Sequence, residues 1–535
     1  MGRWAKPVCS RDQIVLFAPT LQDSVPEDHP VRLFDEVLGQ LDFGDWERQY
    51  ILVDGQPPIH PRVMAAVVLY GLSLGIRSSR KLEDSCGNRI DFIWLTEGRV
   101  IDHSTLAGFR VRFAVELKGM FRQIGRVAIG LGMANLNQVA LDGTVKRSNN
   151  SRFAVARRTP LEQKLAALDQ QVEELLKQAE QMDRKEDELF GESSPTKLPA
   201  DLKQIQARQK RLAAALKKVR EVEARQEAKG RLSQDGPAAP TTDPDSSLMK
   251  NKAGGFAPNY LVVLATEGSN GLIMDYQVPE GGDEPSSVIP ALNNLKEAYG
   301  PGAAEASDAL ESSAPGLPSV NPSVKELLAD SSFNTGSNLQ QLKQAGVEPW
   351  MAAKQQPAPK ARTTASAAQS EFPVNPKTKA LDKSAFTYDP TADVYHCPAA
   401  RTLPFSHQSR AERQDGTVTY RVYESTDCSG CPLAGRCLSG KNKTRSVRRD
   451  EHEPLREEMA ARMACEAGRR KYRRRSFLAE TPFAVMNTTM NVRQLLLRGI
   501  DKVRTEVGWI CSAYNLKKLT KLLATRRQEG AMLGG

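Results

Sequence analysis

Three carboxylates stand where a metal-dependent phosphoryl-transfer site would need them. Asp142 follows a strand-like run over 137–141, and Asp330 ends a second short apolar run over 327–329. Glu480 lies at the start of a basic stretch that favours helix. Two acids at strand ends and a third on a late helix suit a pair of divalent ions, because Mg²⁺ prefers oxygen ligands and needs few carboxylates. We therefore expect the three side chains to meet in one Mg²⁺ site.

Each acid also has a plainer interpretation. An aspartate at a strand end, such as Asp330, is often a turn or cap residue, and Glu480 alone would be a solvated helix residue. Asp275 is a rival second acid, but it lies inside an expected hairpin strand and we interpret it as structural. Asp243 and Asp245 lie in a Pro/Asp/Ser stretch that favours a turn.

The composition favours a polyanionic partner and a reduced compartment. The chain has 535 residues, and 74 Lys and Arg outnumber 64 Asp and Glu, for a net charge of +10. Nucleic acid is the first candidate for such a chain. Its eight cysteines are too few and too uneven for a secreted disulfide scaffold. No apolar leader is visible, and the longest apolar run, 63–76, is shorter than the roughly 20 residues of a membrane-spanning helix.

Changes in pattern along the chain predict several parts and a mixed α/β fold. Apolar spacing of four and three over 161–226 predicts a coiled-coil hairpin, and 353–392 is rich in Ala, Pro, Ser and Thr, as in linkers. The expected parts are a helical DNA-binding or dimerisation domain over 1–130, a strand-and-helix core over 135–352 that contains the hairpin 161–226, a linker over 353–392, a cysteine-rich insertion over 393–450, and a helical, basic part of the core over 451–535.

Basic side chains gather beside the expected strands and on the late helix. We expect them to contact DNA phosphates, which position the duplex without reading its sequence. The alternative is an ordinary set of solvated arginines and lysines. The candidates are Arg77, Arg80, Lys146, Arg147, Arg473, Arg474 and Arg475.

Four cysteines form a candidate zinc site. Cys428 and Cys431 are spaced as Cys-x-x-Cys, Cys437 follows six positions later, and Cys397 lies upstream, next to His396 as a substitute ligand. Four thiolates would close a tetrahedral, structural zinc site that leaves no open position for chemistry. The alternative is four unligated cysteines on a loop.

With these residues in hand, the chain resembles the DDE transposases of bacterial insertion sequences. The resemblance is to the subgroup with an N-terminal helical domain and a cysteine-bearing insertion before the catalytic glutamate. Several similar segments in the right order are more specific than any one of them. The segments are 60–62, 75–80, 102–105, 142–144, 243–250, 329–330, 427–433, 479–483 and 497–506.

The resemblance implies an RNase H-like catalytic core. Asp142, Asp330 and Glu480 would hold two Mg²⁺ ions that serve DNA cleavage at the element's ends and strand transfer into target DNA. It further implies DNA as partner, a homodimer or higher homo-oligomer, no membrane, and a place in the bacterial cytoplasm at the nucleoid. The alternatives are an RNase H-like nuclease without strand transfer and a catalytically decayed DNA-binding relic.

Three departures from the family pattern lie near the expected site. Asn487 stands where the family places a DNA-contacting lysine, so we expect Asn487 at the DNA. Arg475 is one position too far from Glu480. Ser332 and Phe333 replace a glycine and a tyrosine after the second aspartate.

Overall fold

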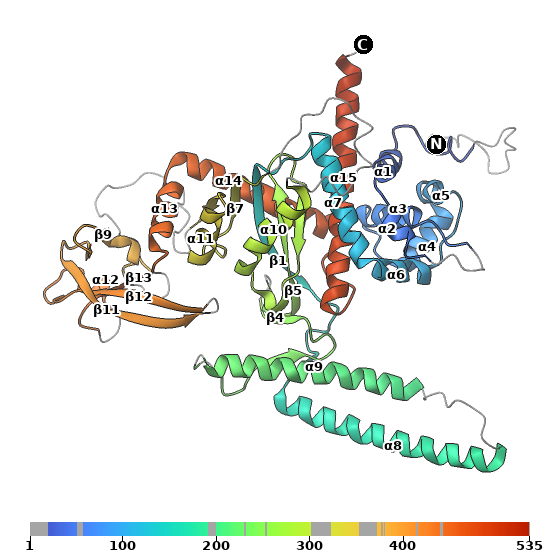
Figure 1. The fold of residues 1–535 in the computed structure, drawn as a ribbon, viewed down its shortest axis with the longest axis horizontal. Coiled ribbons are helices and arrows are strands. Elements are labelled where there is room, and N and C mark those ends of the chain that lie inside the picture. The colour runs from blue at the N-terminus through green and yellow to red at the C-terminus, as the bar shows by residue number, and fades with distance from the viewer. Residues whose placement is uncertain are drawn as a thin grey trace, which may run out of the picture.

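The protein is described here from a computed structural model. The structure describes residues 20–50, 57–190, 200–228, 230, 232–251, 254–300, 323–352, 372–375, 378, 380–413, 416–438 and 442–533. These residues form a mixed α/β structure (Figure 1). Within this part of the chain, no helix combines the length and apolar character needed to cross a bilayer.

A central sheet of six strands organises the molecule. Its order is β4-β5-β1-β7-β8, and β6 also pairs with β5. β1 pairs antiparallel with β5 and parallel with β7, and β7 pairs parallel with β8. The strands are β1 (Gln138–Arg147), β4 (Ser247–Lys250), β5 (Phe256–Glu267), β6 (Ile273–Gln277), β7 (Glu326–Ala329) and β8 (Glu348–Met351).

β1 is longer than its sequence pattern indicated. The expected strand ended at 141, yet β1 continues to Arg147, so Asp142 lies within the strand and not at its tip. The reason is β5, which pairs with β1 from Val139 to Arg147. The parallel partner β7 pairs only as far as Leu141, so the parallel pairing stops one residue before Asp142.

In the described part of the chain, seven helices precede the sheet. They are α1 (Pro30–Gly39), α2 (Gly44–Glu47), α3 (Pro61–Ser73), α4 (Ser79–Asn88), α5 (Ile90–Leu95), α6 (His103–Arg112) and α7 (Ala114–Gly130). The Asp102 side chain accepts hydrogen bonds from the backbone N–H groups of Ser104 and Thr105 and so caps α6. Phe113 separates α6 from α7.

The hairpin predicted over 161–226 consists of two long helices, α8 (Arg158–Phe190) and α9 (Ala200–Ala228). Figure 1 shows them side by side, projecting from the sheet. Leu161, Leu168, Leu212 and Leu216 pack together near the base, where β2 (Val155–Arg157) pairs with β3 (Ala238–Pro240). The connection between α8 and α9, residues 191–199, lies outside the described residues.

A second sheet of five antiparallel strands carries the cysteines. Its order is β13-β12-β11-β10-β9. The expected linker 353–392 needs correction at its end, since β9 and a 3-10 turn (Lys383–Ala385) lie inside it, and Leu381 and Phe386 are buried. Residues 353–371 lie outside the described part. The strands are β9 (Thr387–Asp389), β10 (Val394–His396), β11 (Thr402–Arg413), β12 (Gly416–Glu424) and β13 (Ser446–Arg449).

Apart from α12, the remaining described helices pack around the central sheet. They are α10 (Val288–Tyr299), α11 (Gly336–Gln344), α12 (Ala434–Cys437, in the second sheet's subdomain), α13 (Glu453–Ala464), α14 (Glu466–Thr488) and α15 (Ile500–Leu533). α14 contacts β1, β5 and β8, and α15 contacts α1, α3 and α7. The N-terminal helices and the central sheet therefore share one hydrophobic core.

Candidate active site

Asp142 and Arg475 join the central sheet to α14. The guanidinium Nη1 of Arg475 lies 3.3 Å from Asp142 Oδ1, and both side chains are 15% exposed. Side chains alternate along a strand, so Asp142 and Lys146 project from the same face of β1. α14 covers that face, because Lys146 also contacts Asn487 near the end of α14.

Glu480 reaches the same arginine from the middle of α14. Its Oε1 lies 3.8 Å from Arg475 Nη2, and its side chain is 60% exposed. Arg475 is one position further from Glu480 than in the family pattern, yet it contacts both Asp142 and Glu480. Arg475, which the sequence suggested as a DNA contact, instead lies between two carboxylates.

Asp330 follows directly after β7 and is held by Ser332. The backbone N–H and the hydroxyl of Ser332 donate to Asp330 Oδ1 at 2.6 and 2.5 Å. Ser332 Oγ also lies 2.8 Å from Oε2 of Glu284. Phe333, the next residue, is fully buried and anchors this turn in the core. Glu284 is a fourth acid that sequence reasoning missed, because it lies in an irregular segment between β6 and α10.

The acids influence one another through space. The pKa of Asp142 is raised to about 6: burial is the largest cause, the charges of Asp330 and Glu480 add to the rise, and Arg475 opposes it. Burial, together with the charges of Asp330 and Asp142, raises the pKa of Glu284. Asp142, Asp330, Glu480 and Glu284 therefore lie close enough together for their charges to interact.

Lys146 and Asn487 are paired with each other. Lys146 is buried, and its ammonium donates to Asn487 Oδ1 at 2.5 Å and to the backbone oxygen of Val492 at 2.9 Å. A contact between Lys146 and DNA would require this pair to open. The asparagine that replaces the family's lysine thus has a specific partner within this chain.

The other basic candidates divide into anchored and exposed side chains. Arg77 Nη2 pairs with the buried Glu506 at 2.8 Å, and Arg77 Nη1 donates to the Asn491 backbone oxygen at 3.0 Å. Arg474 is exposed and donates to the Gly268 backbone oxygen at 2.8 Å. The exposed side chains are Arg80, Arg147, Arg473 and Arg474.

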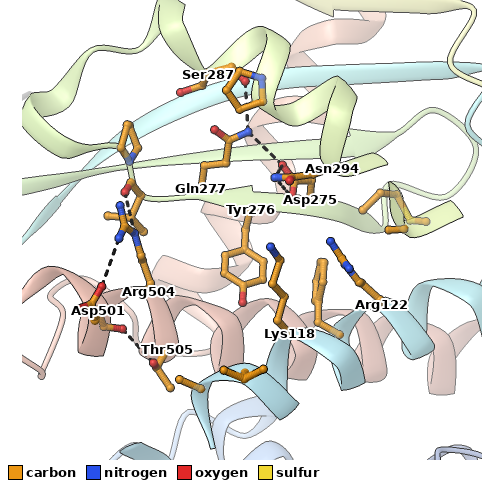
Figure 2. A pocket seen from close by; sticks show the side chains of 18 of the residues that line it. Lys118, Arg122, Asp275, Tyr276, Gln277, Ser287, Asn294, Asp501, Arg504 and Thr505 are labelled. Carbon is orange, nitrogen blue, oxygen red and sulfur yellow. Dashed lines mark hydrogen bonds and ion pairs between the residues drawn. The ribbon is translucent and has the colours of Figure 1, made fainter. Parts of the chain in front are cut away.

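The rival acids lie in other places. Asp275 is buried and accepts from the side chains of Gln277 and Asn294 beside a cavity of about 660 Å³ (Figure 2). That cavity is lined from β6, α7, α10 and α15, and none of the three candidate catalytic acids lines it. Asp243 accepts from Tyr260 at 2.8 Å, and Asp245 accepts from the backbone N–H of Ile500 at the start of α15. These contacts agree with structural roles for all three residues.

The four cysteines surround one small cavity. Cys397, Cys428, Cys431 and Cys437 all line a space of about 20 Å³ beneath the second sheet. Burial raises the pKa of the Cys437 thiol, and the other three cysteines raise it further. His396 is exposed on β10, and its imidazole lies 4.0 Å from Asp389. Thiolates are the ligand type of a closed zinc site, and the four cysteines line one cavity, although no three of their sulfur atoms lie within 4.8 Å of one another.

One other group has the residue types of a metal site. Within the described residues, Glu83, Asp102 and His103 are the one group of three or more ligand atoms lying within 4.8 Å of each other. Asp102 already caps α6, and His103 Nδ1 lies 2.8 Å from Glu83 Oε2. The cap and this contact account for the cluster.

Two family models match the chain, in the order expected for a transposase. The transposase DDE domain matches residues 396–520, and the transposase domain (DUF772) matches residues 19–112. Together the two matches support an insertion-sequence DDE transposase. The first match includes Glu480 of the transposase but not Asp142 or Asp330, which only the folded chain brings near Glu480. No curated protein and no solved structure matches the transposase.

Proposed function

We propose that this transposase binds the ends of its insertion sequence and catalyses DNA strand cleavage and strand transfer. The observation that carries the proposal is that Arg475 contacts both Asp142 and Glu480, while the charges of Asp330 and Glu480 act on the pKa of Asp142, although the three acids come from distant segments. An RNase H-like core is supported by the sheet, in which β6, β5 and β1 are antiparallel while β1, β7 and β8 are parallel.

The acids fit a divalent cation. Asp142 is mostly buried, and burial is the main cause of its raised pKa; Arg475 opposes that rise, and the charges of Asp330 and Glu480 add to it. Asp142, Asp330 and Glu480 would hold Mg²⁺, which when bound supplies activation of the attacking oxygen and stabilisation of the leaving oxygen. Their carboxylate oxygens are the ligand type that Mg²⁺ prefers.

The chain's own residues have positioning roles in this proposal. Arg475 holds Asp142 and Glu480 in register, and Ser332 orients Asp330 through two hydrogen bonds. The exposed Arg147 on β1 and Arg473 on α14 would contact DNA phosphates. The N-terminal helices and the α8–α9 hairpin would serve DNA binding or self-association in a homodimer or larger assembly.

The cysteine-bearing sheet is proposed to hold one structural zinc ion. The supporting observation is that Cys397, Cys428, Cys431 and Cys437 line a single cavity. A closed four-cysteine site has no open position, so zinc would stabilise this sheet and would not take part in cleavage.

The test is strand cleavage of DNA that carries the element's own ends, with Mg²⁺ and with EDTA. Asp142→Ala, Asp330→Ala and Glu480→Ala should each abolish cleavage while DNA binding remains. Asp501→Ala is the matched control, since its carboxylate is 89% exposed on α15 and should be dispensable. Cleavage at the wild-type rate in any of the three variants would remove that residue from the site.

Product analysis distinguishes the transposase from its rivals. Joined products in the same reactions would establish strand transfer, whereas cleaved but unjoined ends would indicate a nuclease. Intact DNA binding without cleavage by the wild type would indicate a decayed copy.

A further inference from the structure

Glu284 touches the turn that carries Asp330. It precedes a 3-10 turn (Pro285–Ser287) that leads into α10, and its Oε2 lies 2.8 Å from Ser332 Oγ. The same hydroxyl lies 2.5 Å from Asp330 Oδ1. A hydroxyl has one hydrogen and can donate to one carboxylate at a time. With both acids ionised, the second contact therefore needs a cation or a shared proton nearby.

Gly143 leaves room for the Glu284 carboxylate beside β1. A Cβ at position 143 would collide with Glu284 Oε1 and lie 3.0 Å from its Cδ. Because side chains alternate along β1, this space lies on the face opposite to the Asp142 side chain. The glycine after Asp142 is thus explained by the close approach of a second acid.

The arginine near the site contacts acids other than Glu284 and Asp330. Arg475 contacts Asp142 and Glu480. Among the described residues, no Arg, Lys or His nitrogen lies within 4.0 Å of the carboxylates of Glu284 or Asp330. Two acids that share one hydroxyl without a protein cation form an arrangement that a bound divalent ion would complete.

We propose that Glu284 is a fourth carboxylate of the metal site, acting beside Asp330. The proposal rests on the function proposed above, since it adds a residue to the same site. Glu284 would bring negative charge and oxygen ligands to the Mg²⁺ held at Asp330, either directly or through the water that Mg²⁺ keeps.

The decisive variant is Glu284→Gln, measured by Mg²⁺ calorimetry and by thermal melting in EDTA and in Mg²⁺. Glutamine keeps the shape, and its amide N–H can donate to Ser332 Oγ while the Ser332 hydroxyl donates to Asp330, but it removes the charge. We expect Mg²⁺ binding to weaken by about tenfold or more. In EDTA the Tm should stay equal or rise, because repulsion from Asp330 and Asp142 is relieved. The Tm increase on adding Mg²⁺ should shrink.

Gly143→Ala tests the same idea without changing Glu284. The atom it would displace is the far end of a flexible side chain, so the strand should tolerate the methyl group while Glu284 moves away. Mg²⁺ binding should weaken as in Glu284→Gln. Glu280→Gln is the control, because Glu280 is 77% exposed and its nearby ion-pair partner is Arg504 on α15.

The outcomes separate this proposal from the proposed function. Wild-type Mg²⁺ affinity in Glu284→Gln, with loss of binding in Asp142→Asn, would overturn the role of Glu284 alone. Unchanged Mg²⁺ binding in both variants would overturn the proposed function and this inference together. A lower Tm of Glu284→Gln in EDTA, with Mg²⁺ affinity unchanged, would make Glu284 a structural partner of Ser332 and overturn the proposal.

Discussion

Arg475 organises acids that come from different elements. It lies 3.3 Å from Asp142 on β1 and 3.8 Å from Glu480 one turn further along α14. A guanidinium donates in several directions within one plane, so one arginine can hold two carboxylates that would otherwise repel each other. The unusual spacing before Glu480 is therefore compatible with this contact.

A pH prediction follows from Asp275. Its burial raises its pKa to about 7 in the folded chain, against 3.8 for a solvated aspartate. The folded state therefore binds this proton more tightly, and stability falls as the pH rises from about 4 to about 7. Asp275→Asn should remove this loss, which is on the order of 2–3 kcal/mol between pH 5 and pH 8. Urea unfolding of both proteins at the two pH values measures it. An equal pH dependence in both would contradict the assignment.

The pair of Lys146 and Asn487 supports a charge-swap experiment. Asn487→Lys would place a second ammonium against the buried Lys146. We expect a loss of about 2 kcal/mol in the free energy of unfolding. The double variant Lys146→Asn/Asn487→Lys should recover most of it. Thr488→Lys is the control, since Thr488 is the next residue on α14 and its side chain is exposed. A stable Asn487→Lys variant that binds DNA more tightly would show that the pair opens readily.

At the scale of elements, the position of Asp142 depends on how far each neighbouring strand extends. β5 supports β1 to Arg147, while β7 stops pairing at Leu141 and turns away through Asp330 and Ser332. The end of β7 places Asp330 beside Asp142 and leaves space for Glu284 next to Gly143.

The cysteines of the second sheet lead to a prediction about zinc content and stability. Cys428→Ser should remove bound zinc and lower the free energy of unfolding by about 4 kcal/mol, because a closed site contributes its binding energy to folding. Metal analysis of the purified protein and thermal melting measure the two effects. Cys465→Ser is the matched control, since Cys465 is exposed and caps α14, a role that serine fills well. A wild-type protein without stoichiometric zinc would contradict the prediction.

At the scale of the whole molecule, α15 joins the N-terminal helices to the central sheet. Trp509 is almost fully buried, its ring centroid lies 5.9 Å from that of Trp46 and 5.8 Å from that of Phe109, and its indole N–H donates to the Arg110 backbone oxygen. On the same helix, Asn515 donates to the backbone oxygen of Ile273 on β6 at 2.7 Å. The N-terminal helices and the central sheet therefore both pack against α15.

This joint predicts that the two parts unfold together. Trp509→Ala should lower the free energy of unfolding by about 3–5 kcal/mol and keep a single transition for the N-terminal helices and the sheet. Hydrogen exchange during thermal melting can follow α3 and β1 separately. Lys502→Ala, at an exposed position of α15, is the control. Separate loss of protection in α3 before β1 would show that the N-terminal helices form an independent domain.

The sequence by itself located elements whose signals are local. Periodicity and turn residues predicted the helical hairpin now seen as α8 and α9, the hairpin strand around Asp275 now seen as β6, and the short strand β7 within a few residues. Such signals depend on neighbours within one or two turns of the chain. Motif order likewise indicated the transposase family, which the two family models confirm. The catalytic roles of Asp142, Asp330 and Glu480 stay predictions.

Only the tertiary structure decided which side chains meet. Arg475 is 333 positions from Asp142, and Lys146 is 341 positions from Asn487. No local pattern records such pairings, because they follow from the strand order and from the way α14 crosses β1. The same reason hid Glu284, whose irregular segment has no periodicity. It becomes a member of the acid cluster only when α10 and the end of β7 are packed together.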